Sequence, residues 1–223
     1  MDICSSSPSL KQEEVMKHEW RKKEKKCYLP KNRPEFIEIP EFNFFTIKGE
    51  GNPNDPHFPE YIGVLYALSY AVKMSYKSGL APKDYYDYTV YPLEGVWDLK
   101  PEAREKFNGT IIKDDLVFTL MMRQPDFVDE KFFKIVLSLT EKKKPHPLLA
   151  EVRFETIAEG PCIQMMHLGS YDDEPASFAL MEKFAADNHQ SRLDKTHREI
   201  YLTDARKVAP EKQKTVLRFR VDP

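Results

Sequence analysis

The stretch Thr196–Asp204, with the sequence THREIYLTD, alternates between polar and apolar side chains with a period of two residues. This period is typical of a β-strand, in which successive side chains point to opposite faces. Ile200 and Leu202 share the face that must meet a core, so Glu199 and Tyr201 share the opposite face. A carboxylate held on a strand needs a partner, and a cationic or hydrogen-bonding ligand can be that partner where the protein supplies none. The stretch therefore predicts a binding site centred on Glu199.

The composition bounds the class of protein. The chain has 223 residues, of which 41% are hydrophobic and 12% aromatic, enough for one large domain or two small fused units. A net charge of −2 gives the whole molecule no bias towards polyanions. Cys4, Cys27 and Cys162 share no spacing that suggests a disulfide framework or a zinc site. The sequence shows no close pair of histidine ligands and no nucleophile elbow, so we expect neither a metal nor a cofactor.

The first 35 residues differ in composition from the rest of the chain. Residues 1–16 are rich in Ser, and we expect them to form a disordered extension. Residues 17–35 form a basic arm, which we interpret as a solvated helix rather than a nucleic-acid-binding arm because the remaining chain is net acidic. No apolar run is long enough for a membrane span, and the N-terminus lacks the apolar core of a signal peptide. A cytoplasmic protein with no specific nucleic-acid or membrane partner is predicted.

Residues 36–223 are predicted to form a single domain made of two pseudo-repeats, at about 36–145 and 146–223. Both halves follow the order strand, helix, strand, strand. Aligning the two halves places Val90 over Ile200 and Tyr91 over Tyr201. This order predicts an α+β fold in which duplicated β-α-β-β modules form an antiparallel-rich sheet, with helices on one face and a ligand groove on the other.

The spacing of apolar side chains and the positions of turn residues predict where the individual helices and strands lie. The expected helices begin near residues 57, 129 and 174, where apolar side chains recur at helical spacing. A hairpin is expected between Tyr85–Val90 and Trp97, with Glu94 exposed at its tip. The other predicted strands are 36–49, 115–122, 152–156, 162–168, 199–202 and 215–221.

Five segments together resemble the GyrI-like (gyrase-inhibitor-like) small-molecule-binding domain, from about residue 17 to residue 221. The segments are EWRKKE (19–24), GEGNP (49–53), YTVYPLEGVW (88–97), QMMHLGSYDDEP (164–175) and HREIYLTD (197–204). The resemblance implies two β-α-β-β modules around a ligand groove. It also implies a glutamate in that groove that recognises amphipathic cations, and this glutamate falls on Glu199.

The resemblance also bears on the type of protein. Relatives often carry an N-terminal helix-turn-helix domain, but only about 35 residues precede the first expected strand here, so a stand-alone module is expected. The segment Tyr91–Trp97 is similar to a stand-alone subgroup with aromatic-rich grooves, whose members resemble enzymes that hydrolyse cyclopropane-bearing DNA-alkylating natural products. The family name also implies a third possibility, a modulator of gyrase or of another protein partner.

The main hypothesis is therefore broad-specificity binding of amphipathic aromatic, often cationic, small molecules. The candidate ligand-binding residues are Glu199, Tyr201, Tyr91, Trp97, Tyr66, Tyr70, Thr89 and His167. In the alternative hydrolase, Glu199 acts as a general base, a tyrosine hydroxyl polarises the conjugated carbonyl of the substrate, and Tyr91 and Glu94 are further catalytic candidates. Each residue also has a structural interpretation, for example ion pairing of Glu199 with Arg198 or His197, or core packing of Trp97.

Overall fold

A computed structural model describes residues 17–106 and 110–222; the extension expected at residues 1–16 lies outside the described part. Six antiparallel strands form one closed barrel, in the order β1-β3-β2-β5-β6-β4 around the ring. The strands are β1 (Glu35–Glu50), β2 (Leu93–Leu99), β3 (Leu116–Gln124), β4 (Arg153–Leu168), β5 (His197–Tyr201) and β6 (Lys214–Arg220). The predicted α+β class with antiparallel strands is confirmed, and closure leaves the sheet without an open edge.

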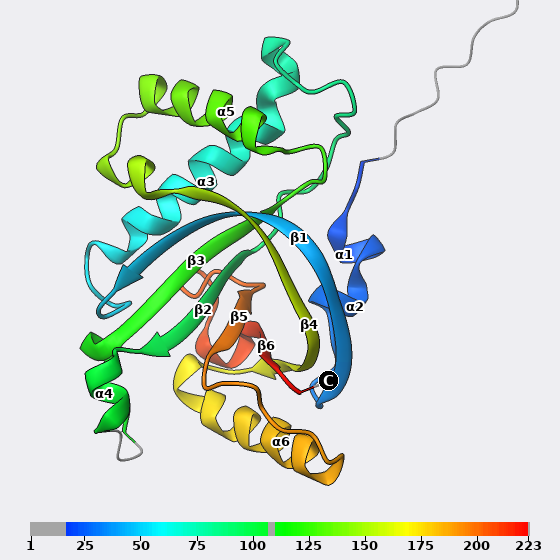
Figure 1. Ribbon diagram of the computed structural model, residues 1–223, viewed down its shortest axis with the longest axis vertical. Helices are drawn as coiled ribbons and strands as arrows, with labels where there is room; N and C mark the ends of the chain where they lie inside the picture. Colours follow the sequence, from blue (N-terminus) through cyan, green and yellow to red (C-terminus); the bar gives the residue numbers. More distant parts are fainter. Residues whose placement is uncertain (1–16, 107–109, 223) are drawn as a thin grey trace, which may run out of the picture.

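Three long helices flank the barrel, and short helices lie in the arm and the loops. The helices are α1 (Trp20–Lys23), α2 (Lys25–Tyr28), α3 (Phe58–Met74), α4 (Pro101–Glu105), α5 (Glu130–Lys143) and α6 (Glu174–Asp187). Figure 1 shows α3 and α5 together on one side of the barrel and α6 on the opposite side. The chain order β1-α3-β2-β3 followed by β4-α6-β5-β6 gives the two expected β-α-β-β modules.

The modules meet along two seams, where β1 pairs with β4 and β2 pairs with β5. At the second seam Gly95 lies opposite Glu199. The hairpin expected between Tyr85–Val90 and Trp97 is wrong, because β2 runs without interruption through Gly95 and only Tyr88 makes an isolated bridge in the earlier segment. Pro92 lies just before β2 and ends no strand. The strands expected at 152–156 and 162–168 are one long strand, β4.

Two hydrophobic cores hold the helices on the outer surface of the barrel. Leu65 and Leu68 of α3 are fully buried against the β1–β3–β2 side, with Ile47 and Leu120 in the same cluster. Met181 of α6 is buried against the β4–β6 side, in a separate cluster with neighbouring strand residues. Along each strand, every second side chain therefore points outward, where helices cover it. The side chains between them point into the barrel.

The barrel interior carries a network of paired charges. Arg198 lies beside Glu94 at 2.6 Å and Glu159 at 2.9 Å, and Arg218 lies beside Glu159 at 2.8 Å. Gln164 accepts a hydrogen bond from the Arg218 guanidinium at 3.0 Å. Each buried carboxylate of this network has an arginine partner, as a charge in a low-dielectric interior requires.

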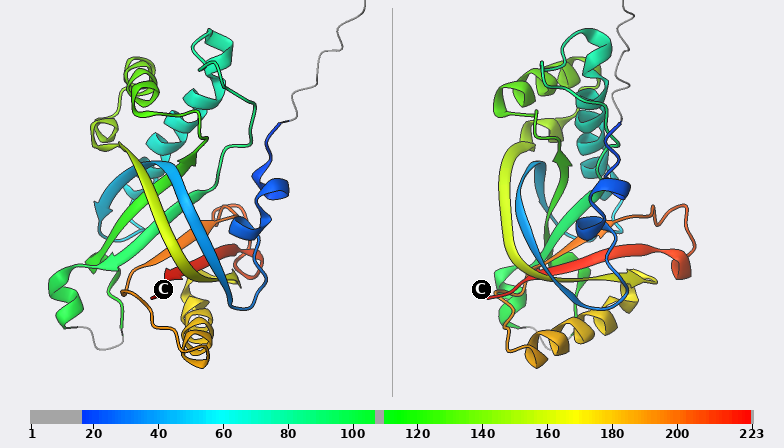
Figure 2. Two further views of the ribbon diagram at one scale, coloured as in Figure 1. Left: turned by 45° about the vertical axis from the view of Figure 1, so that its right-hand side comes forward. Right: turned by 90° about the vertical axis from the view of Figure 1, so that its right-hand side faces the viewer.

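The N-terminal arm packs into the domain. Trp20 and Tyr28 are buried, and the Trp20 indole nitrogen donates a hydrogen bond to the Val90 carbonyl oxygen at 3.0 Å. Glu24 forms an ion pair with the buried Arg123, so the arm contributes a charge to a buried network rather than forming a fully solvated helix. Both views in Figure 2 place α1 and α2 directly against the barrel.

Because Trp20 is buried, we expect Trp20→Ala to lower the free energy of unfolding by about 3–5 kcal/mol through loss of apolar contacts and creation of a cavity. Urea denaturation followed by circular dichroism measures the change. Lys25→Ala, an exposed position in the same arm, is the matched control and should change stability by less than about 0.5 kcal/mol. Equal effects of the two substitutions would contradict the arm's role in the core.

Candidate functional site

Strand β5 separates two chemical environments. His197, Glu199 and Tyr201 point outward between α3 and α6, while Arg198 and Ile200 point into the barrel. The predicted alternation of this strand is therefore correct. The sequence also predicts that the face of the sheet carrying Glu199 has no helices against it. In the structure, helices flank this face. The closed barrel explains the difference: its interior is filled by side chains, and the outward face is the one that meets the rest of the molecule.

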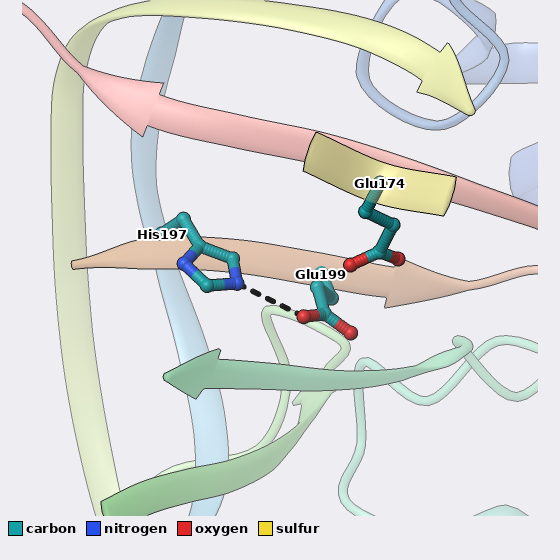
Figure 3. Close-up of side chains that lie close together, drawn as sticks. All are labelled: Glu174, His197 and Glu199. Atoms are coloured by element: carbon teal, nitrogen blue, oxygen red, sulfur yellow. Dashed lines mark hydrogen bonds and ion pairs between the residues drawn. The ribbon is translucent and has the colours of Figure 1, made fainter. Parts of the chain in front are cut away.

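The carboxylate of Glu199 is nearly buried, with 8% of the residue exposed. The Nε2 atom of His197, two residues earlier on the same strand, lies 2.9 Å from Glu199 Oε1. Glu174, the first residue of α6, points towards Glu199 from the opposite side (Figure 3). Two carboxyl groups and an imidazole therefore meet at one point, although Glu174 lies far from β5 in the sequence.

Glu174 is a buried acid without sufficient partners. Burial raises the pKa of its carboxyl strongly, and the negative charge of Glu199 raises it further. One of its oxygens, Oε1, lacks a hydrogen-bond partner among the described residues. Two buried carboxylates in contact cannot both stay ionised without a counter-charge, so a proton on Glu174 relieves the repulsion. The pair thus holds a proton at neutral pH.

Aromatic side chains surround this carboxyl pair. Trp97 Nε1 donates a hydrogen bond to the Tyr201 hydroxyl at 2.8 Å, and the Trp97 ring stacks on Phe58 of α3 with centroids 6.0 Å apart. Tyr171 meets Tyr201 edge to face at 6.0 Å. Burial, followed by the charge of Glu199, raises the pKa of the Tyr201 hydroxyl well above its usual value, so this hydroxyl stays protonated and can donate.

Gly95 makes room for the hydrogen bond between Trp97 and Tyr201. A Cβ at this position would lie 2.9 Å from Trp97 Nε1 and 3.0 Å from the Tyr201 hydroxyl oxygen. A side chain of any size would therefore collide with the aromatic wall. The glycine also lies directly opposite Glu199 in the strand pair, which leaves the space beside the carboxylate to the rings.

Two catalytic candidates from the sequence lie elsewhere. Tyr91 precedes β2 and donates a hydrogen bond to Glu24 of the arm at 2.8 Å. Glu94 is only 2% exposed and pairs with Arg198 inside the barrel, so its expected solvated position at a hairpin tip is wrong. The alternation of side chains along β2 explains this placement, because Glu94 points into the barrel whereas Gly95 and Trp97 point outward.

The remaining candidates occupy other surroundings. Tyr66 and Tyr70 of α3 stack on each other at 6.3 Å, and Tyr70 is half exposed. His167 is buried, with Nδ1 2.9 Å from Ser177 Oγ and Nε2 2.9 Å from the Ser170 carbonyl oxygen. Thr89 is partly buried, and its backbone nitrogen donates to the His18 carbonyl oxygen in the arm. Of the predicted ligand-binding residues, the structure brings together Glu199, Tyr201 and Trp97.

Sequence reasoning missed Glu174, Tyr171 and Phe58. The sequence predicts a helix start at 172–175, where an acidic side chain normally interacts with the helix dipole and with water. Its burial against a second carboxylate depends on how α6 docks on the barrel. His197 lies two residues before Glu199 and so shares its strand face, and the structure adds their direct contact.

Glu174, His197 and Glu199 also form a group of potential metal ligands. Each offers one ligand atom, and these three atoms all lie within 4.8 Å of one another. The sequence predicts no metal because its histidines form no close ligand pair, but sequence spacing cannot detect a ligand supplied by another element.

A cavity of about 260 Å³ lies on the other side of β5, at one mouth of the barrel. Its lining includes Arg198, Arg218, Met121 and Glu155. Glu199 does not line this cavity, whereas its partner His197 does. In the part of the chain that is described, no helix is long and apolar enough to cross a membrane.

The geometry agrees with comparisons to known proteins. The family described as GyrI-like small molecule binding domain matches residues 33–222. The chain belongs to the GyrI-like family. Two solved structures, each described as a hydrolase from Listeria innocua, are similar to this GyrI-like chain at 35% and 36% identity. They cover 92% and 93% of this chain and 100% of their own, with TM-scores of 0.83 and 0.84.

A third structure, an uncharacterized conserved protein from Listeria innocua, is 36% identical with a TM-score of 0.83. It covers 92% of this GyrI-like chain and 100% of its own. No curated protein sequence matches the chain. The similarity over nearly the whole chain supports the family and the fold.

The raised pKa of Glu174 gives a prediction about stability. Glu174 keeps its proton in the folded state, whereas in the unfolded state it releases the proton above about pH 4.5. The contribution of Glu174 to the free energy of unfolding is therefore fully present below that pH and is lost as the pH rises. We expect Glu174→Gln to raise the free energy of unfolding at pH 7 by roughly 1–3 kcal/mol, because an amide needs no proton. The gain should shrink towards pH 4 in urea titrations. Glu211→Gln, at an exposed position, should give no such pH-dependent gain.

Gly95 gives a second prediction. We expect Gly95→Ala to lower the free energy of unfolding by about 1–3 kcal/mol through overpacking, and to alter tryptophan fluorescence as the bond between Trp97 and Tyr201 breaks. Gly63→Ala in α3 is the matched control, because a Cβ there meets nothing within 4 Å. It should instead stabilise the helix by about 0.5–1 kcal/mol. An unchanged fluorescence spectrum in Gly95→Ala would show that the site tolerates a side chain.

Proposed function

We propose that this protein binds flat, amphipathic aromatic small molecules, with a preference for cations, at the Glu199 site. The observation that carries the proposal is a contrast among the buried carboxylates. Glu24, Glu94 and Glu159 each pair with an arginine. Among the described residues, by contrast, the ion-pair partner of Glu199 is His197 rather than a lysine or arginine. A positive ligand supplies the counter-charge that the fold leaves out.

The aromatic surroundings fit the same class of ligand. The faces of Trp97, Phe58 and Tyr201 offer negative π-electron density, which attracts flat or cationic groups by about 0.5–2 kcal/mol per contact. Stacking together with one carboxylate sets few directional constraints, so many shapes of ligand are compatible. Broad specificity follows from this chemistry.

A ligand reaches Glu199 by displacing an aromatic side chain. Tyr171 packs against Tyr201 from outside and is 41% exposed, while Trp97 and Glu199 are nearly buried. Tyr171 also lies in a 3₁₀ turn, Tyr171–Asp173, that leads directly into α6. Rotation of Tyr171 therefore opens the site with a smaller loss of buried contacts than rotation of Trp97.

A second candidate function is hydrolysis of cyclopropane-bearing DNA-alkylating compounds. Two observations favour it: similarity to hydrolases over nearly the whole chain, and a carboxyl pair in which one acid is held protonated beside another carboxylate. A protonated carboxyl group beside a second carboxylate can serve as the acid of an acid–base pair. Glu199 takes a proton from water as the water oxygen attacks a ring carbon. The ring bond breaks towards the conjugated carbonyl, whose oxygen is polarised by the Tyr201 hydroxyl.

Glu199→Gln tests the binding function. We expect the affinity for a cationic dye to fall about 5- to 150-fold, corresponding to about 1–3 kcal/mol for a lost charged interaction. A neutral dye of equal shape should change little, and fluorescence quenching measures both. Glu155→Gln is the control, because Glu155 lines the barrel-mouth cavity. A loss confined to Glu155→Gln would place the dye in that cavity and overturn the assignment to Glu199.

The same variant separates binding from catalysis. With a cyclopropane substrate under single-turnover conditions, removal of a general base should slow product formation by about 10²–10⁴-fold while substrate affinity changes little. Mass spectrometry of the ring-opened product follows the reaction. Binding without any product in the unsubstituted protein would leave the protein as a binding module and exclude the hydrolase.

A further inference from the structure

We propose that Glu174, His197 and Glu199 bind a divalent first-row transition-metal ion such as zinc. This inference goes beyond the binding of organic molecules, although it uses the same two carboxylates. It rests on the donor set, on its burial and on a buried Glu174 oxygen, Oε1, that lacks a hydrogen-bond partner among the described residues.

The three donors converge from two elements of the fold. Glu174 begins α6, while His197 and Glu199 lie two residues apart on β5 and thus on the same strand face. Their ligand atoms lie within 4.8 Å of one another, and His197 Nε2 is 2.9 Å from Glu199 Oε1. Figure 3 shows the Glu174 carboxylate above Glu199, with the imidazole on its other side. Two ligand atoms of one ion lie at most about 4.4 Å apart when the bonds are about 2.0–2.2 Å long, so small side-chain movements bring these donors around a single ion.

The charge balance favours a divalent ion. Glu174 and Glu199 are 6% and 8% exposed, and within the described part of the chain neither forms an ion pair with a lysine or arginine. A single proton shared by the two carboxyl groups neutralises one of them and leaves the other negative charge beside the His197 imidazole. A divalent cation neutralises both carboxylates. The buried site is then neutral, which a low-dielectric environment prefers.

The donor types select the metal. One imidazole nitrogen with two carboxylate oxygens suits zinc, cobalt or manganese, whereas calcium and magnesium require six or more oxygen ligands. Three protein ligands leave at least one position for water, as in open rather than structural zinc sites. The surroundings also hold the donors in place: Phe178, one turn after Glu174 on α6, packs edge-on against the His197 ring at 4.7 Å.

A metal and an organic cation would compete, because both require the charge of Glu199. The experiment therefore measures the two ligands on the same full-length protein, first treated with a chelator. Equilibrium dialysis against ZnCl₂ with elemental analysis should give one ion per chain. Cobalt should give visible d–d absorption without a thiolate charge-transfer band, which separates this site from the cysteines Cys27 and Cys162.

Variants locate the metal. Glu174→Gln and His197→Asn should each weaken zinc binding at least tenfold, with folding verified by circular dichroism. The double substitution His57→Ala and His146→Ala is the control, because these side chains form a surface pair of histidines around Glu60. It should leave zinc binding unchanged. Loss of zinc in the surface control, or retention in Glu174→Gln, would overturn the proposal.

The two proposals fail separately. If the chelator-treated protein binds the cationic dye but no zinc, the metal site is rejected and the binding function stands. If it binds zinc with the expected variant pattern but no dye, the metal site stands and organic-cation binding is rejected. Zinc that displaces the dye in the unsubstituted protein supports both.

Discussion

The pairing of β2 with β5 is the constraint on which the rest of the structure depends. This seam joins the two β-α-β-β modules and closes the barrel. Because side chains alternate along a strand, closure sends every second residue of β5 into the barrel and the others outward. Arg198 therefore joins the interior network, while Glu199 lies outside among aromatic rings. A shift by one residue would bury the arginine with the rings and leave Glu199 facing the interior carboxylates.

The distribution of arginines gives the outward site its chemistry. Arg123, Arg198 and Arg218 point inward and neutralise the buried glutamates of the arm and the barrel. The fold thereby concentrates its buried cations on one side of β5. Glu174 and Glu199 on the other side have a histidine, a proton and aromatic rings as neighbours. Two buried carboxyl groups without a lysine or arginine partner cost stability, which is common where a protein keeps a group for a ligand.

The two sides of β5 also differ in their packing. The inward side borders a cavity at the barrel mouth. The outward side is filled by the hydrogen-bonded pair Trp97 and Tyr201, for which Gly95 provides the space. A ligand at Glu199 therefore replaces contacts that aromatic side chains make with one another. This exchange favours large aromatic ligands over small polar ones, because only the former restore the buried apolar surface.

The sequence alone determined the class of fold, the two repeated modules and the position of Glu199 on a strand, because period and turn residues act locally. It also identified Trp97 and Tyr201 as neighbours of the site. The placement of Tyr91 and Glu94 could not be predicted from period and turn residues. It depends on the residue at which β2 begins and on which face of β2 points into the barrel. The contact between Glu174 and Glu199 was decided only by the tertiary structure. Two carboxylates distant in sequence are brought together when α6 docks on the barrel, and the hydrophobic contacts of Met181 that drive this docking carry no information about the charges at the start of the helix.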